Sequence, residues 1–319
     1  MSESSPLDGI LRGSDDTRLR ATWRVVAATV AFLAVFVPLV VVVRAAPVPK
    51  LIRNAHVILP AAAGTAAVVV AAKRLEGRSV AAQGFSFDRQ WWVDFVGGVG
   101  LGVLAQCVIH GLWVATGAAT VVETLSTGVV SGAAVVVPVV GAAIGYLGIG
   151  LWEEALYRGV LVRNGVDGLV ARGLTPRTAV LGVVVGGAVL FGVPHVFVPA
   201  AGASATFAAV QGVVAVVYYT AAYVLTEQLA LPVGLHFSMN FMTGAVFPAA
   251  DSGVPALVRF DRSFTGDPSV VGVMVVATVL LTLAVAAWVR LTRGEVSVRE
   301  CFGTDAPPTG TAVRGDTDD

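Results

Sequence analysis

Hydrophobic residues occur along this 319-residue chain in blocks of Val, Ala, Leu and Gly that are too long for the helices of a soluble protein. A run of about 20 apolar residues can cross roughly 30 Å of hydrocarbon as a helix. Eight such runs are present, approximately Val25–Val43, Val57–Ala72, Val93–Gly117, Ala133–Tyr157, Ala179–Val198, Phe207–Leu225, Leu231–Phe247 and Val270–Val289. The polar–apolar alternation that a closed barrel needs is absent. The pattern therefore predicts an all-α, polytopic integral membrane protein with about eight transmembrane helices.

The composition agrees with this class. The chain is 56% hydrophobic and 13% charged, with a mean hydropathy of +0.81, whereas about 25% of the residues in an average soluble domain are charged. Ser, Thr, Gly, Asp and Pro accumulate toward both ends of the chain. We therefore expect an N-terminal tail at residues 1–24, a multi-helix membrane domain at 25–291, and a disordered C-terminal tail at 292–319.

The distribution of Lys and Arg predicts the orientation. If the N-terminus is cytoplasmic, 16 of the 21 basic residues lie in cytoplasmic segments. The five in outer segments are Arg44, Lys50, Arg53, Arg259 and Arg262. This split follows the positive-inside rule and predicts a multi-pass protein of the plasma membrane with both termini cytoplasmic. The net charge of zero thus hides an asymmetry across the lipid bilayer, and it argues against a nucleic-acid partner.

A few polar residues interrupt the apolar runs. They are Gln106, His110, Glu153, Glu154, Arg158, His195, Gln211, Glu227, His236 and Asn240. A carboxylate in the bilayer costs roughly 2.5–3.5 kcal/mol even on lenient insertion scales, so an ionisable residue there is a functional hypothesis by default. The alternative for each is a polar group bonded to a neighbouring helix, and we interpret Gln106, His110, Gln211 and Glu227 in that way.

The spacing of the other polar residues along their helices shows which of them share a helix face. Glu154 and Arg158 are four residues apart and can pair on one helix face, while Glu153 is rotated about 100° away. His236 and Asn240 repeat the four-residue interval on the seventh run. A carboxylate, two imidazoles and an amide can together activate water and stabilise an oxyanion.

Three sequence motifs carry a family resemblance. The segment "EEALYRG" resembles the E-E-x-x-x-R motif of the CPBP family of intramembrane proteases, which includes CAAX prenyl protease 2 and is also called the Abi family. The segment "FGVPH" resembles its F-x-x-x-H motif, and "GLHFSMNF" resembles its H-x-x-x-N motif. The three occur in the family's order, each on its own apolar run, and the resemblance covers a core at about 93–247.

The resemblance implies a helical intramembrane endopeptidase and a role for each motif residue. Glu153 would be the general base that activates water, and Glu154 with Arg158 would be its supporting pair. His195 would hold or polarise the water. His236 and Asn240 would stabilise the oxyanion. The implied substrates are peptide segments at the membrane, with prenylated CAAX-type C-termini as one candidate, and we expect the cavity to open toward the cytoplasm.

A metal is an open alternative. Glu153, His195 and His236 could form a His₂Glu set for zinc with an open position for water, in which case Glu154 would have to be the base. The H-E-x-x-H motif is absent from the chain. A metal-free mechanism uses the same residues, and the sequence does not separate the two.

The expected span ends conflict with such a site. In a helix that starts at Ala133, Glu153 lies about 30 Å along the span, near the cytoplasmic face, whereas His195 lies about 24 Å away from that face. Starting the fourth helix near Pro138 and continuing it past Arg163 would bring Glu153 toward mid-depth. A break in the fifth helix at Gly186–Gly187 or at Pro194 would also help.

Two other functions compete with the peptidase. A small-solute transporter would also place polar residues at mid-depth, but such proteins usually contain inverted repeats, and no internal repeat is visible. A non-enzymatic immunity or scaffold protein could keep the fold without the activity. The intact set of Glu153, His195, His236 and Asn240 argues against this second alternative.

Overall fold

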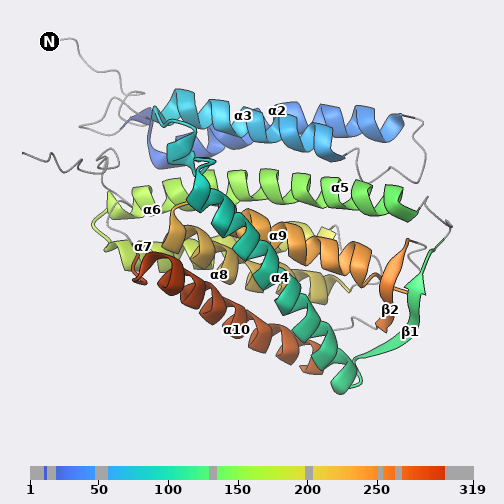
Figure 1. Cartoon of the computed structure of the whole chain (residues 1–319). Helices are drawn as coiled ribbons and strands as arrows, with labels where there is room; N and C mark the ends of the chain where they lie inside the picture. The colour runs from blue at the N-terminus through green and yellow to red at the C-terminus, as the bar shows by residue number, and fades with distance from the viewer. Residues whose placement is uncertain are drawn as a thin grey trace, which may run out of the picture.

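The computed structural model describes residues 11–12, 19–46, 57–128, 135–197, 204–250, 254–262 and 268–298. These residues form a bundle of helices (Figure 1). The helices are α2 (Ala21–Ala45), α3 (Ile58–Glu76), α4 (Arg89–Ala115), α5 (Val136–Glu154), α6 (Arg163–Val170), α7 (Pro176–Phe197), α8 (Ala205–Thr226), α9 (Ala230–Phe241) and α10 (Pro268–Arg293). The helical membrane architecture predicted from the sequence is confirmed. Most of both predicted tails lies outside the described residues.

Two π-helical segments extend these helices. The segment η4 (Ala155–Val162) joins α5 to α6, so that one continuous helix runs over Val136–Val170. The segment η5 (Met242–Val246) continues α9. The segment η4 begins directly after Glu154 and contains Arg158, and η5 begins two residues after Asn240. Backbone of this kind occurs frequently at functional sites.

Seven helices of the described part are long and apolar enough to cross a membrane, which makes the chain a multi-pass membrane protein. The seventh predicted run, Leu231–Phe247, forms α9 and η5 instead of a lipid-facing span. The helix α9 has only 12 residues, and it packs against α4, α5 and α8. Leu231, Val233 and Leu235 are completely buried. The run is apolar because it lies in the protein core.

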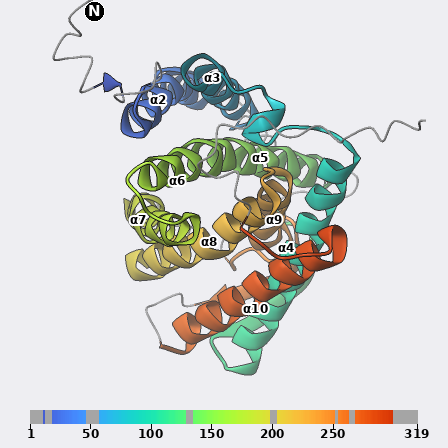
Figure 2. The same cartoon turned by 90° about the vertical axis from the view of Figure 1, so that its left-hand side faces the viewer.

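The helices are arranged in layers. The pair α2–α3 lies on one side of α5–α6, and α7, α8 and α9 lie on the other, with α10 and the oblique α4 beyond them (Figure 2). Apart from α6, which continues α5 in the same direction, consecutive helices run in opposite directions (Figure 1). We call the end where α3 ends and α4 begins the basic end. Its basic residues include Arg20, Arg24, Lys73, Arg74, Arg78, Arg89, Arg172, Arg177, Arg290 and Arg293.

A two-stranded sheet marks the opposite end, which we call the strand end. The strands β1 (Ala119–Ser126) and β2 (Ala256–Arg262) pair antiparallel, with Ala119 opposite Arg262 and Ser126 opposite Ala256, although 129 residues lie between the two strands in the sequence. The apolar runs along the chain do not predict these strands. The buried Arg259 holds them to the neighbouring loop: its guanidinium donates to Glu123, to Ser126 and to the carbonyl oxygens of Ala249 and Val254.

Glycines bring α9 into direct contact with its neighbours. A methyl group added at Gly98 of α4 would collide with the carbonyl oxygen of Leu231, and one added at Gly234 of α9 would collide with that of Phe95. A methyl group at Gly150 of α5 would lie 3.3 Å from the carbonyl oxygen of Val233. Small residues allow such close approach between membrane helices. The contacts bring the motif of α9 beside that of α5.

Candidate active site

Glu154 is the buried centre of the site. Its side chain is 0% exposed, and its Oε1 accepts a hydrogen bond from Nη1 of Arg158 at 3.2 Å. The same oxygen accepts a hydrogen bond from Nδ1 of His236 at 2.7 Å. The ion pair expected from the four-residue spacing of Glu154 and Arg158 is therefore present. The carboxylate of this pair also accepts a hydrogen bond from the imidazole of His236, which is 82 residues away in the sequence.

His236 lies between the two glutamates. Its Nδ1 bonds to Glu154, and its Nε2 lies 3.7 Å from Oε2 of Glu153. The second distance is beyond hydrogen-bond range. A carboxylate bonded to one nitrogen of a histidine fixes the tautomer and directs the other nitrogen. Glu154 thus orients the ring so that Nε2 faces Glu153.

Aromatic rings enclose the supporting pair. The guanidinium carbon of Arg158 lies 5.0 Å from the ring centroid of Phe191 and 5.1 Å from that of Tyr219, within the range of cation–π attraction. The ring of Tyr219 also stacks on His236, with centroids 4.8 Å apart and an interplanar angle of 16°. The sequence analysis missed Tyr219, because a tyrosine in an apolar run gives no signal of such a contact.

His195 lies near the last turn of α7. Its Nδ1 is 2.7 Å from the carbonyl oxygen of Phe191, which leaves Nε2 for other partners. The Phe191 ring packs against the imidazole, with ring centroids 4.8 Å apart. The helix α7 is continuous through Gly186–Gly187 and Pro194, so the break considered at these positions is not found. Close contact between Gly192 of α7 and Gly212 of α8 holds His195 against α8.

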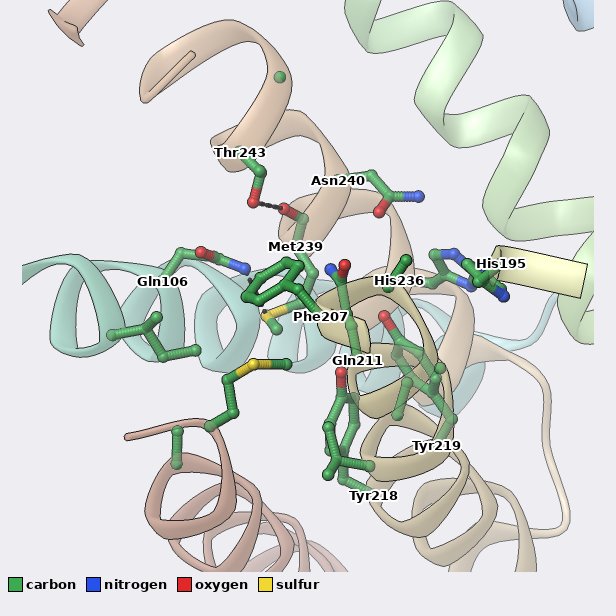
Figure 3. Close-up of a pocket in the computed structure, with 18 of the residues that line it drawn as sticks. Gln106, His195, Phe207, Gln211, Tyr218, Tyr219, His236, Met239, Asn240 and Thr243 are labelled. Atoms are coloured by element: carbon green, nitrogen blue, oxygen red, sulfur yellow. Dashed lines mark hydrogen bonds between the residues drawn. The ribbon is translucent and has the colours of Figure 1, made fainter. Parts of the chain in front are cut away.

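A cavity of about 560 Å³ connects these groups. Glu153, His195, His236 and Asn240 line it, whereas Glu154 and Arg158 lie behind its wall. Figure 3 shows the two histidines toward one side of the cavity and Gln106 toward the other. The carboxamide of Asn240 makes no hydrogen bond to any residue that the structure describes, so it is available to a bound molecule.

Two glutamines that we interpreted as structural also line the cavity. Gln106 is only 5% exposed. Its Nε2 lies 3.5 Å from the sulfur of Met239, and its Oε1 has no hydrogen-bond partner in the described part of the chain. Gln211 faces the same cavity from α8 (Figure 3). The structural interpretation fits His110 better, because its Nδ1 bonds to the Gln106 carbonyl oxygen and its ring packs against Trp113.

The observed helix ends resolve the conflict in depth. The fourth predicted span begins at Val136 and continues to Val170, past Arg163, which puts Glu153 near its middle. His195 lies near the end of α7, toward the strand end of the bundle. The cavity extends from Glu153 to His195, so the two residues share one site without a break in α7.

The zinc alternative can be tested against the donor set. Among the residues that the structure describes, no three His, Cys, Asp or Glu side chains are arranged to hold a metal ion. Nδ1 of each histidine is hydrogen-bonded, His236 to Glu154 and His195 to the Phe191 carbonyl oxygen, so Nε2 is the nitrogen that each could offer to a metal. In the described structure Glu153, His195 and His236 are not grouped as a set of metal ligands, and the proposed reaction is therefore written without a metal.

Comparison with known proteins agrees with the motifs. A family model described as type II CAAX prenyl endopeptidase Rce1-like matches residues 135–242. No curated protein and no solved structure matches the chain. The matched segment runs from the start of α5 to the start of η5 and contains all six candidate residues. The match of residues 135–242 to this family model confirms the resemblance to the CPBP proteases and supports a protease activity.

Proposed function

We propose that the protein is an intramembrane endopeptidase in which Glu153 activates water. The observation that carries this proposal is the arrangement of two adjacent glutamates around one histidine. Glu154 is sequestered by Arg158 and His236, whereas Glu153 has a side chain 14% exposed and lines the cavity. One carboxylate is thus part of the scaffold, and the other is free to act as a base.

The proposed reaction uses the cavity residues in turn. Glu153 would take a proton from water as its oxygen attacks the peptide carbonyl carbon. The N–H of Asn240 would donate to the resulting oxyanion, assisted by His236 when its Nε2 carries a proton. Glu153 would then deliver the proton to the leaving amine as the C–N bond breaks. His195 would hold the water through its free Nε2.

The test is a cleavage assay with protein purified in nanodiscs. Wild type, Glu153→Gln and Glu295→Gln would be compared on fluorescence-quenched peptides with and without a prenylated cysteine, with and without chelator. Glu295 is exposed after α10 and provides the matched control. We expect Glu153→Gln to abolish cleavage with an unchanged melting temperature and Glu295→Gln to cleave normally. Cleavage by Glu153→Gln at the wild-type rate would contradict the mechanism, and loss of cleavage on chelation would require a metal.

We also propose an orientation in which the basic end of the bundle faces the cytoplasm, with both termini on that side. The support is the positive-inside distribution of Lys and Arg. A reporter fused after Gly173, in the turn between α6 and α7, should read as cytoplasmic. One inserted at 251–253 should read as external, and the opposite pattern would reverse the orientation.

A further inference from the structure

The cavity is displaced toward the strand end of the bundle. On α4 its lining begins at Gln106, beyond the middle of the helix, and on α7 it consists of Phe191 and His195 near the C-terminal end. On α8 it includes Phe207 in the first turn. The cavity extends as far as Ala249 and Val254, which precede β2 in the sequence and line it. Glu153 therefore lies near its inner end.

Packed residues separate Glu153 from the basic end. Arg158 is 1% exposed and lies between the rings of Phe191 and Tyr219. Beyond it, Val160 is 1% exposed, Tyr223 is 2% exposed and Leu229 is completely buried. None of these three lines the cavity. Side chains in such a core fill space to the density of an organic crystal, so this layer leaves no passage for a peptide.

Buried polar contacts fasten the helices at the basic end. Asp94 of α4 pairs with Arg293 of α10 at 2.5 Å and accepts from Trp288 Nε1 at 2.9 Å. On the other side of the bundle, Asn164 donates to Glu76 of α3 at 2.8 Å. Separating a buried pair leaves an uncompensated charge, which strongly disfavours opening at this end.

The strand end differs in both charge and structure. Its described basic residues are Arg44, Arg259 and Arg262. Arg259 bonds to Glu123 of β1 and to the carbonyl oxygens of Ala249 and Val254, so it fixes these two residues, which line the outer part of the cavity. The end at which the cavity lies is thus the end that the positive-inside rule assigns to the non-cytoplasmic side.

We infer that the cavity opens to the non-cytoplasmic side of the membrane and admits peptide segments exposed there. This replaces our expectation of a cytoplasmic opening, and its statement about substrates rests on the proposed peptidase function. The cavity lining also favours an uncharged stretch within a polypeptide over a charged chain end. Its polar lining includes the carboxamides of Gln106, Gln211 and Asn240, and none of the lining residues in the described part is Lys or Arg. A free C-terminal carboxylate would therefore meet no lysine or arginine among these residues.

The inference can be tested by cysteine accessibility in intact cells that produce the full chain. The background carries Cys107→Ala and Cys301→Ser, and single cysteines replace Ala249 at the outer wall, Thr243 deeper in the cavity, or Gly173 in the turn at the basic end. Intact and permeabilised cells are treated with a membrane-impermeant maleimide, and the Thr243→Cys protein also with a small cationic methanethiosulfonate. We expect positions 249 and 243 to react in intact cells and position 173 to react only after permeabilisation.

Two results would overturn the inference. The first is labelling of position 173, but not of 249, in intact cells. The second is protection of position 243 in intact cells together with reaction of this position after permeabilisation, since the cavity would then open to the cytoplasm. Because no cleavage is measured, the result stands apart from the peptidase proposal. Labelling as expected together with inactivity toward every peptide would support the route of access and overturn the proposed function.

A cleavage arm then tests the substrate class. The protein is reconstituted in sealed vesicles, and protease added outside digests the terminal tails only where the basic end faces outward, which identifies preparations of each orientation. A peptide that the wild type cleaves in the first assay is then added outside. We expect at least tenfold faster cleavage when the strand end faces outward than when the basic end does, and no cleavage by Glu153→Gln in either orientation. Faster cleavage with the basic end outward, or a preference for peptides with a free prenylated C-terminus over internal segments, would contradict the inference.

Discussion

Glu154 and His236 are 82 residues apart in the sequence, yet Oε1 of Glu154 accepts a hydrogen bond from Nδ1 of His236 at 2.7 Å. The contact joins the first and third motifs, and it makes Glu154, of the two adjacent glutamates, the one that is hydrogen-bonded to His236. The same oxygen also accepts from Arg158. Because the carboxylate of Glu154 is 0% exposed, its partners must compensate its charge inside the protein.

Arg158→Ala should lower both folded yield and activity. The variant leaves Glu154 without its cation, and breaking a buried pair costs about 3–5 kcal/mol. Arg158→Lys should recover only part of the yield, because an ammonium group does not stack between Phe191 and Tyr219 as a planar guanidinium does. Yield and melting temperature would be measured by fluorescence-detected size exclusion.

The double variant Arg158→Met/Glu154→Leu separates stability from function. Apolar residues of similar volume often replace a buried ion pair without loss of stability, so the double variant should be more stable than Arg158→Ala. It should remain inactive because His236 loses its orienting carboxylate. Full activity in the double variant would show that the pair does not contribute to the site.

Asn240→Ala should reduce kcat by about 10²–10³, the usual cost of removing one oxyanion donor. Its melting temperature should stay near that of wild type, because the carboxamide makes no hydrogen bond within the described structure. Asn240→Asp, which keeps the size but removes the donor, should be at least as slow. The measurement is the single-turnover cleavage rate of wild type and both variants on one peptide. A wild-type rate for Asn240→Ala would show that this residue does not take part in the mechanism.

Gly212→Ala should impair both stability and catalysis through His195. The added methyl group would lie 2.7 Å from the Cα of Gly192 and 3.3 Å from Nδ1 of His195. The first contact is with backbone, so α7 and α8 must separate, and overpacking of this kind typically costs about 1–3 kcal/mol. Activity and melting temperature should therefore fall together.

Gly186→Ala is the matched control for this change. An added methyl group at Gly186 of α7 meets no described atom within 4 Å. Replacing a helical Gly by Ala favours the helix by roughly 0.5–1 kcal/mol, so Gly186→Ala should be as stable as wild type or slightly more so. Equal behaviour of the two variants would show that the close contact of α7 with α8 does not position His195.

Gln106→Leu should raise KM while leaving the protein as stable as wild type or more so. The substitution removes a buried carboxamide whose Oε1 has no partner in the described part of the chain, and such a group costs about 1–3 kcal/mol. The comparison is Gln83→Leu. Gln83 is also buried, but its Nε2 donates to the carbonyl oxygens of Val69 and Arg78. We expect only Gln83→Leu to lower the melting temperature, and a similar loss in both variants would make Gln106 structural.

The sequence by itself determined the membrane class and the positions of the candidate chemistry. Transfer into hydrocarbon depends on the local run of residues, so apolar length predicted the helices and Glu153, Glu154 and His236 stood out within them. The four-residue spacing of Glu154 and Arg158 was sufficient to predict their ion pair, because neighbours on one helix face are fixed by local geometry.

Only the tertiary structure decided what lies between the helices. Contacts across helices depend on backbone packing, which at Gly150 and Gly234 is set by residues distant in the sequence. That packing buried α9, joined His236 to Glu154 and made Gln106 part of the cavity wall. The side of the bundle on which the cavity lies follows in the same way. Filled space at the basic end and open space at the strand end result from the packing of all helices together, which no single apolar run encodes.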